Sequence, residues 1–99
     1  MRRHRRLLIS AEVSDRVRQL HPDLKRKVRA TIDALLREPL SGKPLQGDLL
    51  GFHSVRVGKF RVVYRLLRDG VDVLTIGPRR TVYEEAERFA ARSRRRSGC

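Results

Sequence analysis

Residues 52–86 read FHSVRVGKFRVVYRLLRDGVDVLTIGPRRTVYEEA, and this stretch decides the fold of the chain. Apolar and polar residues alternate along it, which is typical of strands that bury one face. Gly58-Lys59 and Asp69-Gly70 interrupt the alternation as two-residue turns. The stretch therefore predicts a three-stranded antiparallel meander, followed by a helix that begins near Val82 after a Thr-x-x-Glu capping box at residues 81–84.

The two turns also predict which side chains share a face of this sheet. One apolar face is expected, and its members are Val55, Val57, Phe60, Val62, Tyr64 and Leu66. In the second hairpin, Asp69-Gly70 as the turn pairs Tyr64 with Thr75 and Arg61 with Pro78. The apolar face needs a cover, and the preceding helical segments are the candidates for it.

The opposite face of the meander carries arginines. The register places Arg56 directly opposite Arg61, with Arg65 two positions farther along its strand. If strand alternation persists to residue 80, Arg80 joins this face and Arg79 points the other way. Like charges on facing strands are unfavourable without a counter-charge, so the cluster indicates an anionic ligand. A solvated cationic face is the alternative interpretation.

The N-terminal half predicts a strand and two helices. Residues 5–10 (RRLLIS) form the strand, and Ser10 is a suitable N-cap for the helix that follows. Apolar residues then recur at helical spacing on both sides of His21-Pro22, in the set Val13, Val17, Leu20, Leu24, Val28, Ile32 and Leu35. The second helix must end before Pro39, so the two helices form an αα-hairpin, and residues 39–51 connect it to the meander.

The predicted fold class is therefore α+β: an N-terminal strand, an αα-hairpin, a three-stranded antiparallel meander and a short C-terminal helix. Ninety-nine residues make a single domain, 1–99, with a basic flexible tail at about 93–99. On the last helix, Arg88 and Arg92 are four residues apart and read as a solvated stripe.

Composition indicates the class of partner. The chain has 24 Lys and Arg against 11 Asp and Glu, a formal net charge of +13, and only four of the cations are lysines. Guanidinium groups match phosphate oxygens in a two-pronged geometry, so nucleic acid is the expected anion. Three scattered histidines and Cys99 show no metal-ligand spacing, and we expect no metal or cofactor. The apolar runs are too short to span a membrane, so a cytoplasmic protein is expected.

Two stretches, GKPLQGDLLGFHSVRVGKFRVVYRL (42–66) and VDVLTIGPRRTVYEEA (71–86), resemble motifs of the RelE/ParE toxin superfamily. The resemblance implies a toxin of a type II toxin–antitoxin pair, with an acidic antitoxin as its partner. RelE-like members cut mRNA on the ribosome without a metal, whereas ParE-like members poison DNA gyrase.

For the RelE-like branch, which we favour, the resemblance implies roles for particular residues. Arg61 and Arg80 would hold and stabilise the scissile phosphate, Tyr83 would orient the target nucleotide, and Arg56 falls where that branch has a lysine or arginine. Further candidates for binding RNA are Arg79, Lys59, Arg65 and Ser54.

The sequence also departs from the RelE pattern. Ser54 stands where that branch has a second lysine, and Pro78 stands where many members have a histidine. His53 faces the core beside Tyr64 in the predicted register, so it reads as a packed side chain. Neither Ser54 nor an arginine is a suitable general base at neutral pH. A ParE-like gyrase inhibitor and a non-catalytic toxin relative that binds only antitoxin or RNA therefore remain alternatives.

Overall fold

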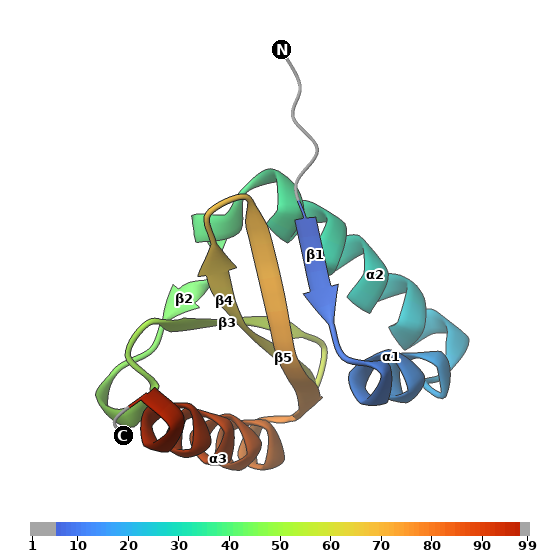
Figure 1. Cartoon of the computed structure of the whole chain (residues 1–99). Helices are drawn as coiled ribbons and strands as arrows, with labels where there is room; N and C mark the ends of the chain where they lie inside the picture. Colours follow the sequence, from blue (N-terminus) through green and yellow to red (C-terminus); the bar gives the residue numbers. More distant parts are fainter. Residues whose placement is uncertain (1–5, 98–99) are drawn as a thin grey trace.

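The computed structural model describes residues 6–97 and contains one five-stranded sheet between two helical layers (Figure 1). The elements are β1 (Arg6–Ile9), α1 (Ala11–Arg18), α2 (Pro22–Arg37), β2 (Lys43–Pro44), β3 (Phe52–Val57), β4 (Phe60–Leu67), β5 (Gly70–Pro78) and α3 (Arg79–Ser97). Strand order is β1-β5-β4-β3-β2, with β1 parallel to β5 and the other neighbours antiparallel. The α+β fold is thus confirmed, with β2 as a short additional strand.

The helical hairpin begins and breaks where the sequence indicated. The Ser10 hydroxyl accepts a hydrogen bond from the backbone N–H of Val13 at 3.1 Å, which caps α1. His21 caps α2 in the same way through Nδ1, and Pro22 opens that helix. Both helices press their apolar stripes onto one face of the sheet, where the buried core includes Val13, Val17, Val28, Ile32, Leu35, Val57, Val62, Tyr64 and Ile76.

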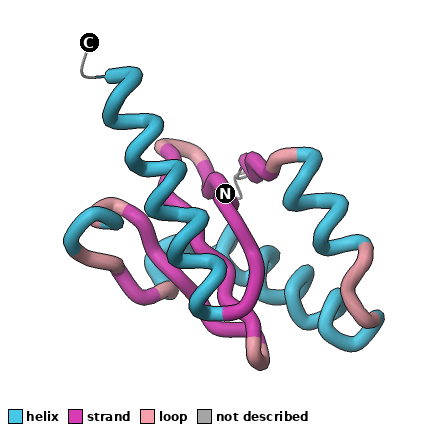
Figure 2. The backbone as a smooth tube through the Cα atoms, turned by 90° about the horizontal axis from the view of Figure 1, so that it is seen from below, coloured by secondary structure: helices cyan, strands magenta, loops and turns pink. Residues whose placement is uncertain are grey.

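Helix α3 covers the opposite face of the sheet, as Figure 2 shows where it crosses the strands. A second buried cluster lies beneath it, formed by Leu49, Phe52, Val63, Val82, Ala86 and Ala90. The sheet is therefore buried on both faces, and the predicted arginine face is the one that α3 shares. Leu66 is an exception to the predicted apolar face, because it lies near the end of β4 and is 37% exposed.

The second hairpin corrects the predicted register. Leu67 pairs with Gly70, so the two-residue turn is Arg68-Asp69, and Gly70 is already the first residue of β5. The parallel strand β1 explains this position, because a Cβ on Gly70 would lie 1.8 Å from the carbonyl oxygen of Arg6. Glycine here serves the close approach of two strands rather than the turn.

A β-bulge then shifts the register a second time. Tyr64 pairs with Val73 and Val63 pairs with Thr75, which leaves Leu74 without a partner on β4. Thr75 is consequently turned toward α3 instead of facing the helical hairpin. Arg61 lies opposite Gly77, not Pro78.

Helix α3 begins earlier and ends later than the sequence indicated. It starts at Arg79, directly after β5, so Thr81 lies inside the helix and does not cap it. The helical backbone continues to Ser97, within the segment interpreted as a tail, while residues 1–5 and 98–99 lie outside the described residues. Within residues 6–97, no helix is long and apolar enough to cross a membrane.

Candidate functional site

A strongly basic hollow lies where the tip of the β3–β4 hairpin meets the start of α3. Arg56 pairs with Arg61 across the two strands, as the sequence indicated. The hollow measures about 170 Å³ and is lined by Arg56, Gly58, Lys59, Phe60, Arg61 and Arg79. We call it the cationic hollow. Its lining holds four cationic side chains and no carboxylate, and none of the four forms an ion pair with a described carboxylate.

Local backbone geometry shapes this hollow. Gly58 has a φ of +60°, the left-handed conformation that a tight hairpin turn requires and that glycine adopts without strain. The Nε of Arg56 donates to the carbonyl oxygen of Gly58 at 3.3 Å, which holds that side chain along the turn. The unpaired N–H groups at the start of α3 add to the positive potential, because Arg79 is the first residue of that helix.

The positions of Arg79 and Arg80 differ from the prediction. Strand alternation ends at Pro78, and α3 begins immediately, so the two residues follow helical rather than strand geometry. Arg79 lines the cationic hollow, although the strand pattern had directed it away. Arg80 is exposed and is not part of the lining. Arg79 rather than Arg80 lines the hollow because the chain changes from strand to helix at residue 79.

Two hydroxyl groups lie next to the cationic hollow. The Ser54 hydroxyl and the Tyr83 phenol oxygen are 3.2 Å apart, and Ser54 is almost fully buried. Ser54 precedes Arg56 by two residues on the same face of β3, and Tyr83 follows Arg79 by four residues on the same stripe of α3. The hydroxyl pair and the cationic hollow therefore both lie between β3 and the first turn of α3.

Arg65 belongs to a different environment. Its Nε donates to the Asp72 carboxylate at 3.1 Å, and its guanidinium lies 5.3 Å from the centre of the Phe89 ring. These contacts place Arg65 under the middle of α3 and separate it from Arg61, which is four residues earlier on β4. Arg65 therefore does not join the cationic hollow.

Sequence reasoning missed a polar network that ties α3 to α1 and β5. One nitrogen of Arg16 donates to the Thr75 hydroxyl at 3.2 Å, to the Ile76 carbonyl at 3.0 Å and to the Glu85 carboxylate at 3.0 Å. The Thr75 hydroxyl also donates to Glu85. Only the bulge at Leu74 turns Thr75 toward Glu85, and no sequence pattern marked that bulge.

The ionisation of Glu85 reflects this network. Burial raises the pKa of the Glu85 carboxyl, but hydrogen bonds from Thr75 and Arg16 and the charges of Arg16 and Arg88 outweigh burial. The net effect is a pKa below the usual value. Glu85 is therefore ionised at neutral pH, and Arg16 compensates its charge.

His53 lies on the opposite face of the sheet from the cationic hollow. It pairs with Tyr64 across β3 and β4, and the two rings stack with centroids 5.5 Å apart. This confirms its interpretation as a packed side chain. Among the described residues, no group of three His, Cys, Asp or Glu side chains is arranged to hold a metal ion.

Comparison with known proteins places the chain in a family. The family model described as the ParE toxin of the type II toxin–antitoxin system parDE matches residues 9–83. The chain belongs to this toxin family. The match extends from the end of β1 to Tyr83 and so includes every residue of the cationic hollow. A comparison with curated proteins found no match.

Solved structures place this toxin in the RelE/ParE superfamily by fold. The toxin–antitoxin complex RelBE2 of Mycobacterium tuberculosis contains a chain with 28% identity and a TM-score of 0.67, covering 76% of the toxin and 98% of that chain. Free E. coli RelE carrying two arginine-to-alanine changes has 19% identity and a TM-score of 0.69. The match covers 85% of the toxin and 95% of that chain. A chain of the YoeB–YefM complex of Staphylococcus aureus has 17% identity and a TM-score of 0.64. The match covers 76% of the toxin and 97% of that chain.

Proposed function

We propose that this type II toxin is a ribosome-dependent mRNA interferase. The observation that supports the proposal is the cationic hollow, in which four cations converge without a carboxylate partner among the described residues. Such a cluster costs stability unless an anion occupies it, and a phosphate diester fits guanidinium donors and a helix N-terminus. The neighbouring hydroxyl pair adds groups that can contact a ribose or a base.

The proposed reaction needs no metal. The ribose 2′-oxygen attacks the adjacent phosphorus, the P–O5′ bond breaks, and the products are a 2′,3′-cyclic phosphate and a 5′-hydroxyl. Arg61, Arg79, Arg56 and Lys59 stabilise the extra negative charge of the phosphorane. Tyr83, held by Ser54, orients the nucleotide or donates a hydrogen bond near the leaving oxygen. Arg80 contacts the strand from the exposed side of α3.

Ribosome dependence follows from what the hollow lacks. The 2′-hydroxyl must lose a proton, and the lining of the hollow offers no carboxylate or imidazole to accept it. Arginine has a pKa above about 12 and is a poor base. We therefore expect the toxin to supply electrostatic stabilisation, and the ribosome or solvent to accept the proton from an mRNA held in a reactive geometry.

The description of the matching family supports a second candidate, inhibition of DNA gyrase, because that family carries the ParE name. The cationic hollow would then bind a phosphate of DNA or an acidic surface of the enzyme. This candidate requires no RNA cleavage and predicts DNA damage as the first cellular effect.

An antitoxin is the proposed protein partner. Structural neighbours include RelBE2 and the intact E. coli RelBE, each described as a toxin–antitoxin complex. With a net charge of +13, this toxin should bind an acidic antitoxin. Co-expression with its cognate acidic antitoxin, to be sought in the neighbouring reading frame, should yield a stable complex and restore growth.

The test of the proposed activity compares wild type with Arg61→Ala during induction in cells. We expect growth arrest and new mRNA 5′ ends within ribosome-bound codons for the wild type, and neither for Arg61→Ala. Arg29→Ala removes one exposed positive charge from α2 on the other face of the sheet, and should behave as wild type. Arrest with intact mRNA and inhibited supercoiling supports the gyrase candidate instead. Growth without arrest or cleavage identifies a non-catalytic toxin relative.

A further inference from the structure

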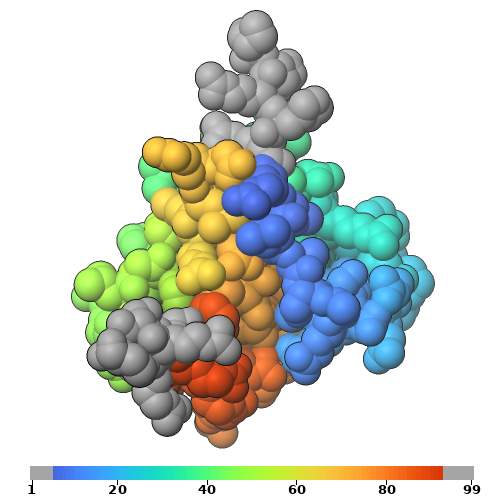
Figure 3. Space-filling view, in the orientation of Figure 1, coloured from blue at the N-terminus to red at the C-terminus, as the bar shows by residue number. Residues whose placement is uncertain are grey.

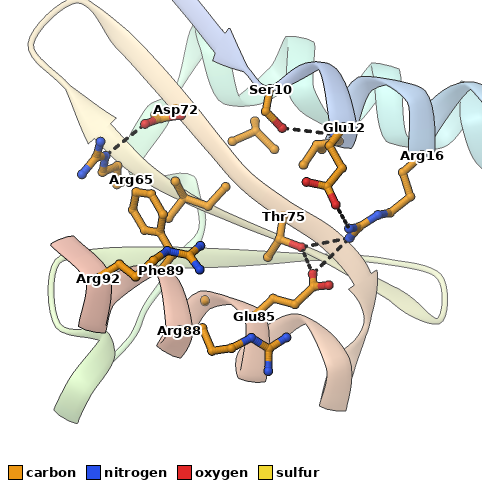
Figure 4. A pocket seen from close by; sticks show the side chains of 14 residues that line it. Ser10, Glu12, Arg16, Arg65, Asp72, Thr75, Glu85, Arg88, Phe89 and Arg92 are labelled. Atoms are coloured by element: carbon orange, nitrogen blue, oxygen red, sulfur yellow. Dashed lines mark hydrogen bonds and ion pairs between the residues drawn. The ribbon is translucent and has the colours of Figure 1, made fainter.

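A larger cavity lies on the other flank of α3, between that helix, β5 and α1. It measures about 540 Å³, roughly three times the volume of the cationic hollow. In Figure 3, the orange surface of β5 is seen between α1 in blue and α3 in red. Figure 4 shows the side chains that line the cavity, and we call it the α1–α3 cavity.

At the end of the cavity near α1, the charged side chains interact with one another. Arg16 directs its donors to Thr75, Ile76 and Glu85, and it also forms an ion pair with Glu12 at 3.7 Å. The two carboxylates exceed the single guanidinium by one negative charge, and the charge of Arg88 also acts on Glu85. This end therefore offers little attraction for an anionic ligand.

The other end of the cavity has uncompensated positive charge. Arg88 and Arg92 both line the cavity, and neither forms a direct ion pair with a carboxylate among the described residues, although the charge of Arg88 contributes to the lowered pKa of Glu85. The whole lining holds four arginines and three carboxylates, so one positive charge is in excess. Figure 4 shows Arg92 beside Phe89 and Arg65, whereas Arg88, one helical turn earlier, lies beside Glu85. Arg88 and Arg92 are both exposed, in agreement with their interpretation as a solvated stripe, and they also lie at the edge of a cavity that contains an aromatic ring.

The Arg65–Phe89 pair places a planar guanidinium over an aromatic ring. Asp72 holds Arg65 at 3.1 Å, so the guanidinium stays near the Phe89 ring. The Arg65 side chain is nevertheless 41% exposed, which leaves part of its planar group accessible. Unstacked RNA bases are commonly bound on aromatic rings and on guanidinium planes, with arginines at the adjoining phosphate.

We propose that the α1–α3 cavity is a second subsite for the RNA strand, in which Arg88 and Arg92 bind a phosphate and the Arg65–Phe89 pair stacks the neighbouring base. This inference rests on the proposed function, because it extends the path of the same strand. Arg88 and Arg92 follow Arg79 by nine and thirteen residues, which corresponds to about 14 and 20 Å along the helix axis. A strand of several nucleotides reaches both subsites, whereas a dinucleotide reaches only one.

The test measures binding of fluorescent single-stranded RNA to the full-length toxin by anisotropy. Arg88→Gln/Arg92→Gln should weaken binding of an octanucleotide about tenfold and lower the salt slope by about 0.7 for each phosphate that the variant no longer neutralises. Dinucleotide binding at the cationic hollow should be unchanged. The control Lys27→Gln/Arg29→Gln removes the same charge from α2, and circular dichroism checks that all variants are folded.

Equal octanucleotide affinity for the Arg88→Gln/Arg92→Gln variant and the control overturns the inference. Loss of dinucleotide binding in that variant also overturns it, because the two subsites would then not be separate. The proposed function is judged independently by mRNA cleavage and Arg61→Ala. If mRNA cleavage is normal and the octanucleotide affinity does not depend on Arg88 and Arg92, only the second subsite is rejected. Octanucleotide binding through these arginines without cleavage rejects only the interferase.

Discussion

The hydroxyl oxygens of Ser54 and Tyr83 lie 3.2 Å apart and connect β3 to the first turn of α3 beside the cationic hollow. Ser54 occupies the position at which the RelE resemblance implied a lysine. A pair of neutral hydroxyls thus replaces a cation at this point, while Arg79 adds one in the cationic hollow. Compared with the RelE pattern, the positive charge of the site therefore lies closer to the tip of the β3–β4 hairpin.

The Ser54–Tyr83 contact should be visible as an energetic coupling. We expect Ser54→Ala and Tyr83→Phe each to destabilise the toxin, and the double variant to cost less than their sum by about 0.5–1.5 kcal/mol. Urea unfolding measures this cycle. Under the proposed function, Tyr83→Phe should also weaken growth arrest. Strict additivity would show that the two hydroxyls do not depend on each other.

Arg79 and Arg80 should differ in importance. Arg79→Ala removes a cation from the cationic hollow, so we expect at least a tenfold loss of dinucleotide affinity and a loss of growth arrest. Arg80→Ala, one residue away and also exposed, should reduce affinity less. Titration with the same labelled dinucleotide compares them. A larger effect for Arg80 would favour the assignment that the family resemblance implies.

Because of Glu85, the stability of the toxin should decrease at acidic pH. Its pKa is lowered in the folded state, so its contribution is complete above the unfolded pKa of about 4.3 and disappears as pH falls through the folded value. Glu85→Gln should cost about 1–2 kcal/mol at pH 7, a modest value because the side chain is 27% exposed. Thermal unfolding from pH 7 to pH 3 should show the gap between the two proteins narrowing. Glu87→Gln, on the exposed side of α3, should show no comparable gap.

Tyr64 should be important for stability rather than for activity. Its phenol accepts from the Gly42 N–H at 3.0 Å and donates to the Pro39 carbonyl at 2.8 Å, so it fastens the loop after α2 to the sheet. Tyr64→Phe leaves a buried N–H without its partner and should cost about 1–3 kcal/mol in urea unfolding. Burial raises the pKa of Tyr64, despite the hydrogen bond from Gly42, so wild type should lose stability above about pH 10. The phenylalanine variant should lack that contribution to the alkaline loss.

Gly70 and Gly77 provide a matched test of strand packing on β5. A Cβ at Gly70 meets the Arg6 backbone, whereas a Cβ at Gly77 meets no atom within 4 Å. Gly70→Ala should therefore displace β1 and destabilise the toxin by more than about 2 kcal/mol, while Gly77→Ala should change stability by less than about 1 kcal/mol. Hydrogen exchange of the β1 amides should rise only in the Gly70 variant. Comparable exchange in both variants would contradict the close approach of β1.

Local signals predicted much of the fold. Ser10, Pro22 and Pro39 marked the helix boundaries because capping and proline geometry act within a few residues. The Gly58-Lys59 turn gave the correct register of the first hairpin, and with it the Arg56–Arg61 pair. These features depend on neighbours in the sequence, so periodicity and turn chemistry were sufficient to find them.

Features set by distant neighbours were missed. Gly70 looked like a turn residue, but its role comes from β1, which lies more than sixty residues earlier in the chain. The Arg16–Thr75–Glu85 network joins three elements and required the bulge at Leu74. The predicted orientation of Arg79 was wrong for a simpler reason: the strand ended earlier than the alternation assumed.

The bulge at Leu74 gives β5 two halves of opposite parity. Odd-numbered Val71 and Val73 face the helical hairpin before it, and even-numbered Ile76 faces the hairpin after it. A one-residue gap placed in this strand of a sequence alignment would therefore exchange the two faces of the sheet for every later position. Alignments of this toxin with its relatives can match the motif letters and still equate the wrong arginines, so the gap in β5 should be placed from structure.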